Sequence, residues 1–354
     1  MKVMFIIPSM AGGGAERVIS VLANEFTEKG IETKIMMTAG NDCVYQLHPD
    51  IELLQAGEMT GGSIRKRFLR IFRMRKLFLE NRDHILIAFE PDAAFFAGIA
   101  KFGLRMKLIA SERNDPASFG NSKTRKLAYK WSQKIVFQTK AAMAYFSPDI
   151  QKKGKVIANP ISSFLPEPYT GKRKKTVVSV GRFEGQKNHR MLLLAFAGFH
   201  TDFPEYSLHL YGKGALEQEL RQLAKELGLE DKVIFEGFHK DVLKRIADAG
   251  MYVLSSDYEG ISNSLLEAMA IGLPVISTDC PCGGSRLCII NEKNGLLTPV
   301  GDKNALEMAM RKMAESEEYA NLLGKEAVSV KTRFSVENIV SKWIAVLQEM
   351  EQLR

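Results

Sequence analysis

Tyr258-Glu-Gly-Ile-Ser-Asn-Ser-Leu-Leu-Glu-Ala-Met-Ala-Ile-Gly-Leu-Pro-Val-Ile-Ser277 predicts a loop, a short helix and a strand in succession. Ser262 and Asn263 are good N-caps, and the later Gly-Leu-Pro ends a helix, so we expect a helix over residues 264–271. The amides at its start and the helix dipole favour an anion in the preceding loop. A strand after such a helix is typical of an α/β sheet.

Two carboxylates bracket this expected helix start, Glu259 in the loop and Glu267 on the helix. Each can accept hydrogen bonds from hydroxyl groups, and an anion could lie between them. Two glutamates at this spacing are, by themselves, more often ordinary solvated helix residues. The remainder of the chain therefore decides between a site and a solvated helix face.

Short apolar strands alternate with helices along the whole chain, which is typical of two doubly wound α/β sheets. At 354 residues and 45% hydrophobic, the chain is long enough for two domains. The Pro- and Lys-rich segment 158–175 is the expected linker. We expect an N-terminal domain over 1–165, a C-terminal domain over 166–335, and an amphipathic helix over 336–354. Two such sheets would face a cleft, with ligands at the carboxyl ends of their strands.

The order of the expected elements is the same in both halves, strand then helix. In the first half we expect strands at 2–7, 32–38, 84–89, 107–111 and 134–138, and helices at 15–29, 64–78, 93–102 and 123–132. In the second half we expect strands at 176–180, 207–211, 233–236, 251–255 and 274–278, and helices at 190–199, 216–227, 242–248, 264–271 and 304–316. No internal repeat is visible beyond this similarity.

Three loops directly after expected strands have residues suited to a ligand. In the first, Gly12-Gly13-Gly14 allows close backbone approach, although the third glycine of a dinucleotide fingerprint is missing and a plain turn would look similar. In the second, Arg182 and Lys187 flank one turn, where two cations could neutralise a diphosphate. The third, around Gly212, is uninformative by itself.

Positive charge is concentrated in the N-terminal half. Residues 1–165 have 25 Lys and Arg against 15 Asp and Glu, a net +10, and the remainder has 24 against 26, a net −2. The excess is greatest over 64–78, where apolar residues at helical spacing alternate with Arg65, Lys66, Arg67, Arg70 and Arg73. Such a helix suits an anionic bilayer or a lipid diphosphate. A helix packed on its own sheet and a nucleic-acid site are the alternatives, although no nucleic-acid motif accompanies it.

Taken in order, these motifs resemble family 4 glycosyltransferases, retaining enzymes with the GT-B fold. The resemblance rests on the N-terminal Gly-Gly-Ala-Glu, Gly181-Arg182 with Lys187, Gly212-Lys-Gly214, the stretch from Glu259 to Glu267, and the Asn-Gly-Leu-Leu that begins at Asn294. It covers nearly the whole chain. Ser-Glu-Arg-Asn-Asp-Pro at 111–116 is similar to members that extend lipid-linked oligosaccharides.

The resemblance implies a role for each matching residue. Arg182, Lys187 and Glu259 are the expected catalytic group, with the cations on the diphosphate and Glu259 on the sugar. Glu267 is expected to bind the ribose. The expected donor-binding residues, in addition to Glu267, are Gly13, Gly14, Gly212, Gly260, Ile261, Ser262 and Asn263.

For the acceptor or membrane side, the candidates are the basic helix with Glu112 and Arg113. Some relatives have His near the position of Arg113, so its contact with acceptor, donor phosphate or neither stays open. Many relatives have Arg-Glu where this chain has Arg286-Leu287, which puts one supporting carboxylate in doubt.

The expected activity is transfer of a hexose or N-acetylhexosamine from a nucleotide sugar, UDP by preference, to a lipid-linked glycan. We expect neither a metal nor another cofactor, and no nucleic-acid partner. The expected location is the cytoplasm, peripheral on the inner face of the cell membrane. The start of the chain has no cleavage-site pattern, no apolar run reaches transmembrane length, and the basic helix suits an anionic bilayer. A nucleotide-sugar epimerase or oxidoreductase, and a non-catalytic membrane-surface relative, are the rival interpretations.

The four cysteines do not have the paired spacing of a structural zinc site, so reduced and mostly buried thiols are expected.

Overall fold

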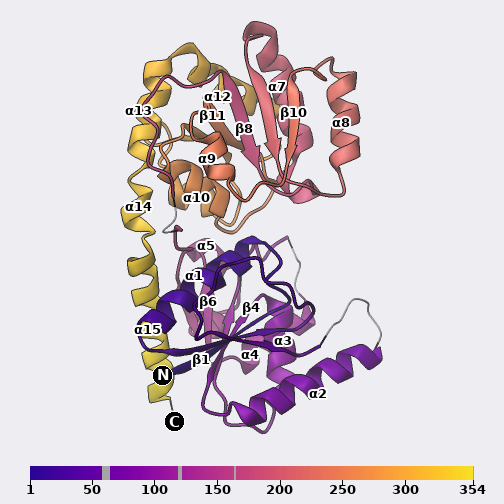
Figure 1. Ribbon diagram of the computed structural model, residues 1–354, viewed down its shortest axis with the longest axis vertical. Coiled ribbons are helices and arrows are strands. Elements are labelled where there is room, and N and C mark those ends of the chain that lie inside the picture. Colours follow the sequence, from indigo (N-terminus) through magenta and orange to yellow (C-terminus); the bar gives the residue numbers. More distant parts are fainter. Residues whose placement is uncertain (58–63, 119–121, 163–164, 354) are drawn as a thin grey trace. The chain divides into compact units, whose positions relative to one another are not determined.

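The computed structural model describes residues 1–57, 64–118, 122–162 and 165–353, which form two compact units (Figure 1). The N-terminal unit consists of Met1–Pro160 together with Val336–Arg354, and the C-terminal unit of Ile161–Ser335. The boundary therefore precedes the expected one after residue 165 and lies at the start of the expected linker.

The N-terminal unit has a seven-stranded parallel sheet in the order β3-β2-β1-β4-β5-β6-β7. Its strands, as far as the chain is described, are β1 (Lys2–Ile7), β2 (Glu32–Met37), β3 (Glu52–Gln55), β4 (Ile85–Phe89), β5 (Leu108–Ser111), β6 (Lys134–Phe137) and β7 (Gly154–Val156). Both β1 and β4 are buried on both faces, which explains their continuous apolar sequences. The direction in which successive strands are added to the sheet reverses between β1 and β4. Ligands of open α/β sheets usually bind at the carboxyl ends of the strands at such a switch point.

Helices cover both faces of this sheet. The described helices are α1 (Gly14–Glu28), α2 (Ile64–Glu80), α3 (Pro91–Ala100), α4 (Lys123–Trp131), α5 (Lys140–Ala144), α6 (Pro148–Gln151) and the C-terminal α15 (Val336–Gln352). Helices α1 and α15 pack together, while α3 packs against α2 and α4 (Figure 1). The core on the α1 and α15 side includes Phe5, Phe26 and Trp343.

The C-terminal unit has a six-stranded parallel sheet in the order β10-β9-β8-β11-β12-β13. Its strands are β8 (Thr176–Val180), β9 (Ser207–Tyr211), β10 (Val233–Gly237), β11 (Met251–Leu254), β12 (Val275–Thr278) and β13 (Leu296–Thr298). Its described helices are the 3-10 turn η1 (Gly185–Lys187), α7 (His189–Asp202), α8 (Glu217–Glu226), α9 (Val242–Ile246), α10 (Asn263–Ala270), α11 (Gly284–Cys288), α12 (Lys303–Glu315), α13 (Glu317–Ala327) and α14 (Val330–Arg333).

The two parallel sheets confirm the predicted fold class. All the expected strands and helices are present, with ends that differ by a few residues. The four cysteines are free thiols, and three of them are buried. Within the described ranges, no helix combines the length and the apolarity that crossing a bilayer requires.

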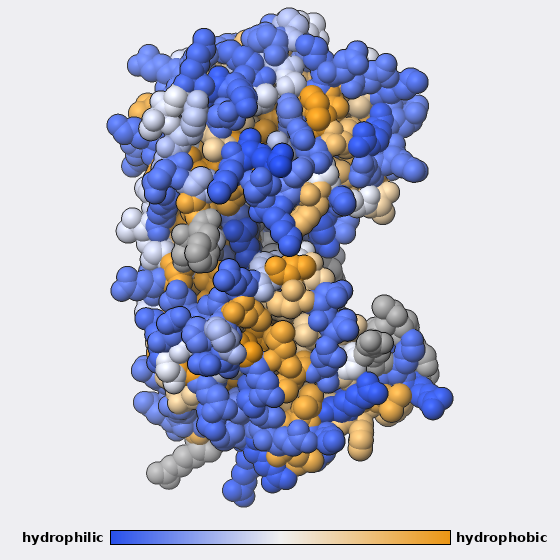
Figure 2. Space-filling model, in the orientation of Figure 1, coloured by the Kyte–Doolittle hydropathy of each residue, from blue (hydrophilic) through white to orange (hydrophobic). Residues whose placement is uncertain are grey.

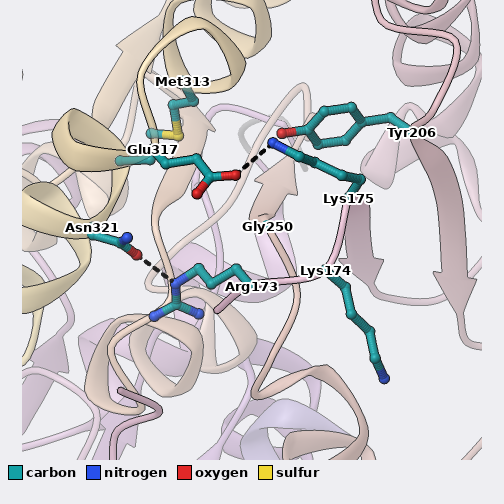
Figure 3. A pocket seen from close by; sticks show the side chains of 9 residues that line it. Arg173, Lys174, Lys175, Tyr206, Gly250, Met313, Glu317 and Asn321 are labelled. Atoms are coloured by element: carbon teal, nitrogen blue, oxygen red, sulfur yellow. Dashed lines mark hydrogen bonds and ion pairs between the residues drawn. The ribbon is translucent and has the colours of Figure 1, made fainter. Parts of the chain in front are cut away.

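The basic run 172–175, expected in a linker, is anchored at the amino ends of the C-terminal sheet. Figure 3 shows Arg173 directed at Asn321 and Lys175 directed at Glu317. The Arg173 guanidinium also donates to the carbonyl oxygens of Ala247 at 3.1 Å, Ala249 at 3.2 Å and Gly272 at 2.6 Å. These contacts tie the ends of several helices together, so Arg173 has a structural role.

Replacing Arg173 with methionine is expected to lower the free energy of unfolding by about 2–4 kcal/mol, because buried carbonyl oxygens lose a charged donor. Urea denaturation measures this change. The neighbouring Lys174→Met variant is the control, since the Lys174 side chain is 65% exposed and forms a surface ion pair with Asp248. The control should change stability by less than about 0.5 kcal/mol. Equal losses in the two variants would contradict the structural role of Arg173.

Candidate active site of the C-terminal unit

Lys187 and Glu259 form an ion pair at the carboxyl end of the C-terminal sheet. The Lys187 ammonium, at the end of η1, donates to Oε1 of Glu259, which lies in the loop between β11 and α10. Their side chains are only 15% and 9% exposed. Glu259 also accepts from Ser256 Oγ at 2.8 Å and from Gln186 Nε2 at 3.4 Å. Shielding from water strengthens the attraction between the two charges.

The turn before α7 holds Lys187 in this position. Asn188 adopts the left-handed conformation with φ of 43°, and its side chain accepts from the Met191 amide at 3.0 Å as the N-cap of α7. The Asn188 amide group also donates to Asp257 at 2.6 Å, and Ser255 Oγ donates to the Lys187 carbonyl at 2.9 Å. These bonds connect η1 to the loop that contains Glu259.

His189 adds no charge beside this ion pair. Its ring lies edge-on to Phe183, with 5.1 Å between ring centroids, and the side chain is buried. Burial, reinforced by the nearby Lys187 cation, lowers the pKa of His189 to about 4. The imidazole is therefore neutral near pH 7, and Lys187 is the cation at this position.

Arg182 lies in the same loop but does not contact the pair. Its side chain is 65% exposed and bonds to Glu184, with 3.2 Å between Nη1 and Oε1. Behind it, the Gly181 and Gly212 backbones pack closely: Gly212 has φ of 147°, and a Cβ there would overlap the Gly181 carbonyl oxygen. This close approach explains why position 212 is a glycine. From the sequence alone, the loop around Gly212 gave no indication of its role.

The helix start between the two glutamates is built as expected. Ser262 is the N-cap of α10 and accepts from the Leu265 amide at 3.4 Å. Asn263 is the first helical residue, while Gly260 and Ile261 are buried in the preceding loop. Gly284, at the start of α11, packs on this loop so closely that a Cβ there would overlap the Gly260 carbonyl oxygen.

Glu267 is buried on α10, with only 4% of the residue exposed. Because both glutamates are buried, neither is the solvated helix residue that the spacing alone would favour. Buried carboxylates are uncommon unless they are paired or functional.

The glycine loop of the N-terminal unit is held by Tyr45. Gly13 is the N-cap of α1, its amide donates to the Tyr45 hydroxyl at 3.1 Å, and its carbonyl accepts from the same hydroxyl at 2.8 Å. The Gly13 amide is thus already bonded within the protein. Gly14 is exposed as the first residue of α1.

A polar cluster lies at the carboxyl end of β5. Buried Glu112 accepts from the Tyr129 hydroxyl at 2.6 Å and lies 3.5 Å from Arg125. Burial raises the pKa of Glu112. Arg113 bonds to Ser111 Oγ at 3.3 Å and to Asn159 Oδ1, and its guanidinium lies 4.8 Å from the centre of the Phe89 ring.

One N–H group of the Arg113 guanidinium is unpaired among the described residues. Burial lowers the pKa of Arg113 to about 9, which still leaves it protonated near pH 7. Its Nε–H is buried and has no hydrogen-bond partner within the described part of the chain.

Helix α2 differs from the expected amphipathic arrangement. Among its described side chains, Met74 and Phe78 are buried, whereas Phe68 and Phe72 are 70% and 69% exposed. The basic side chains divide between the two faces. Arg65, Lys66, Arg67 and Arg73 are exposed, while Arg70 is half-buried with its guanidinium 5.1 Å from the centre of the Phe96 ring. The outward face of α2 is therefore both aromatic and basic.

Several residues of the C-terminal site were not singled out from the sequence. Ser256, Gln186 and Asp257 hold Glu259 and η1, and Gly284 supports the Glu259 loop. The Gly283-Gly284 pair at the start of α11 was the sequence signal that could have pointed to Gly284. Across the ranges that the structure covers, His, Cys, Asp and Glu form no group of three able to hold a metal ion.

The fold is that of an α/β protein with two Rossmann-like domains. In the second domain, the Lys187–Glu259 ion pair lies beside the start of α10. Residues 166–330 match the family model described as glycosyl transferases group 1. This part of the chain is a group 1 glycosyltransferase domain, and the resemblance predicted from the motifs is confirmed.

Several bacterial relatives match almost the whole chain. A Haemophilus influenzae protein named an uncharacterized glycosyltransferase is 26% identical over 350 residues, covering 97% of this chain and 98% of the relative. A Campylobacter jejuni enzyme is 26% identical over 361 residues, covering 99% of each chain. Its name describes an α-1,4-N-acetyl-D-galactosaminyltransferase acting on a glycan linked to undecaprenol through a diphosphate.

Solved structures share the fold. Anabaena HepE in complex with UDP and glucose superposes with a TM-score of 0.82 at 20% identity, covering 99% of this chain and all of that one. The protein therefore has the GT-B fold. The family match favours a glycosyltransferase over the epimerase or oxidoreductase alternative.

Proposed function

We propose that the protein is a retaining, metal-independent glycosyltransferase that moves a hexose or N-acetylhexosamine from a UDP-sugar to a lipid-linked glycan in bacterial surface glycan assembly. The observation that carries the proposal is the shielded Lys187–Glu259 pair beside the start of α10 in a group 1 glycosyltransferase domain. The name of the Campylobacter relative supports a lipid-linked acceptor, and the HepE complex supports UDP.

Each charged group has a distinct task in this proposal. Lys187 and Arg182 neutralise the leaving diphosphate, which supplies the charge stabilisation that a metal ion provides in other transferases. Glu259 accepts hydrogen bonds from the transferred sugar, and Glu267 from the ribose. Lys187 is already held on Glu259, so its ammonium can act on the diphosphate while Glu259 orients the sugar. The acceptor proton passes to a phosphate oxygen of the leaving group.

The test is incubation of the purified protein with UDP-, GDP- and dTDP-sugars and a short-chain polyprenyl diphosphate that has one N-acetylhexosamine. NMR of the product identifies the transferred sugar and its anomeric configuration. Retention of the donor configuration, unchanged by EDTA, is the expected result. An inverted product, or turnover that EDTA abolishes, would contradict the proposed mechanism.

We also propose that α2 places the protein on the anionic cytoplasmic face of the cell membrane. Phe68 and Phe72 lie about one helical turn apart, Leu79 follows Phe72 by about two turns, and all three side chains are exposed. Arg65 and Arg73 flank this row. In the orientation of Figure 1, Figure 2 shows hydrophobic side chains among hydrophilic ones at the lower right, where α2 lies. Aromatic rings with basic neighbours suit the headgroup region of a bilayer.

Changing Phe68 and Phe72 together to serine is expected to weaken binding to phosphatidylglycerol-containing vesicles at least about tenfold, because apolar contact with the acyl chains is lost. The triple change of Arg65, Lys66 and Arg67 to glutamine should weaken it about 100-fold in low salt and less in high salt. Vesicle co-sedimentation measures both effects. Phe238→Ser, which removes a 61% exposed phenylalanine of the C-terminal unit, is the control. Unchanged vesicle binding in the α2 variants would refute the membrane role.

A further inference from the structure

Glu90 has an unusual backbone conformation at the carboxyl end of β4. In the described parts of the chain, three residues other than glycine have positive φ: Asn188, Glu292 and Glu90. Asn188 caps a helix, and Glu292 belongs to a tight turn in which its amide donates to the Gly295 carbonyl. Glu90 has φ of 79° with ψ of 147°, a region that is close to glycine-only. A glutamate here is therefore strained.

The surrounding structure holds this strained conformation. Phe89, the preceding residue, is fully buried, and its ring stacks on Trp343 of α15 with 6.0 Å between centroids. Pro91, the following residue, begins α3. The Glu90 amide donates to the Ser111 carbonyl, and its carbonyl accepts from the Ala94 amide. The backbone is thus fixed on both sides, and glycine would meet the same requirement without strain.

The position is one where α/β sheets bind ligands. β4 is the strand at which the order of the N-terminal sheet reverses, next to β1 and the glycine loop that follows it. On the other side of β4, Arg113 follows β5, and its guanidinium covers the ring of Phe89. Glu90 is exposed at this edge. Strained residues that the surroundings hold in place are concentrated at binding and catalytic sites.

The charges around Glu90 indicate the kind of ligand. Arg113 favours an anionic or strongly polar group, because its buried Nε–H has no hydrogen-bond partner among the described residues. A carboxylate repels phosphate but accepts hydrogen bonds from neutral hydroxyls, often two at once. The combination suits a sugar with a phosphate next to it.

We propose that Glu90 binds hydroxyl groups of the acceptor sugar, with Arg113 on the acceptor's phosphate side. This inference rests on the proposed function. It gives the N-terminal unit a carboxylate that orients the attacking sugar, as Glu259 does for the transferred sugar in the C-terminal unit. The strain at Glu90 then persists because glycine, which would relieve it, lacks the carboxylate.

The test compares Glu90→Gly and Glu90→Gln with the wild-type full chain, and Glu292→Gly is the matched control at the other positive-φ glutamate. The acceptor is the polyprenyl diphosphate N-acetylhexosamine described above, and donor hydrolysis without acceptor is measured in parallel. Glu90→Gly should raise the Tm by about 1–3 °C because strain is relieved. Both Glu90 variants should lower kcat/KM for the acceptor about 10- to 100-fold, with donor hydrolysis unchanged. Glu292→Gly should leave acceptor transfer unchanged.

Two results would overturn the inference while leaving the proposed function intact. The first is normal acceptor transfer by Glu90→Gly or Glu90→Gln. The second is a parallel loss of Tm, donor hydrolysis and acceptor transfer, which would make Glu90 a structural residue. If the wild-type protein transfers no sugar to the polyprenyl diphosphate N-acetylhexosamine, the proposed function fails and this inference fails with it.

Discussion

Replacing Lys187 with alanine is expected to lower kcat by about 10²- to 10³-fold, because the leaving diphosphate loses the cation nearest to Glu259. The variant also leaves a buried carboxylate without its ion-pair partner. Glu259 retains Ser256 and Gln186 as donors, so the cost in unfolding free energy should be only about 1–3 kcal/mol. Steady-state kinetics and urea denaturation measure the two effects separately.

A second substitution separates catalysis from stability. Adding Glu259→Gln to Lys187→Ala removes the uncompensated charge and should restore much of the lost stability, while turnover stays low. Lys312→Ala is the matched control, because it breaks another Lys–Glu pair, Lys312–Glu292, whose side chains are 46% and 60% exposed. The control should have normal activity and nearly normal stability. Recovery of turnover together with stability in the double variant would show that Lys187 is only structural.

Gly284→Ala is expected to lower the free energy of unfolding by about 2–4 kcal/mol and to abolish nucleotide binding. The added methyl group would overlap the Gly260 carbonyl oxygen, which is backbone and has little room to move. The displaced loop contains Glu259 and leads into the N-cap of α10. Urea denaturation and calorimetric titration with UDP measure the two losses.

Gly185→Ala is the control for this change. Gly185 lies in η1, close to Lys187 in sequence, but a Cβ there would have open space around it and its φ is not positive. This variant should be at least as stable as the wild type, since alanine reduces the entropy of the unfolded chain. Normal UDP binding by Gly284→Ala would contradict the role given to the Gly260 loop.

The order of strands and helices could be predicted because most central strands are continuous apolar runs with clear helix starts beside them. The shorter elements could not. β3 is a four-residue edge strand with mostly exposed side chains, and β7 and β13 have three residues each, so none has a distinctive apolar pattern. α11 has five residues and starts at a glycine pair, which resembles a turn.

The motifs identified Lys187 and Glu259 individually, but not their contact. They are 72 positions apart, and they meet because β8 and β11 are neighbours in the sheet. The outward-facing phenylalanines of α2 were also unpredictable, since helical periodicity does not show which apolar face is buried. The backbone strain at Glu90 comes from its positive φ angle. The sequence does not reveal this angle, because a glutamate ordinarily has negative φ.

The most direct test of the central claim is nucleoside diphosphate release by wild type and Lys187→Ala in parallel, with one donor sugar and vesicles containing the polyprenyl diphosphate N-acetylhexosamine. We predict release that requires the lipid acceptor and falls at least about 100-fold in Lys187→Ala. Release at the same rate in both proteins, or no release by the wild type despite UDP and vesicle binding, would contradict the assignment of Lys187 and Glu259 as the transfer site.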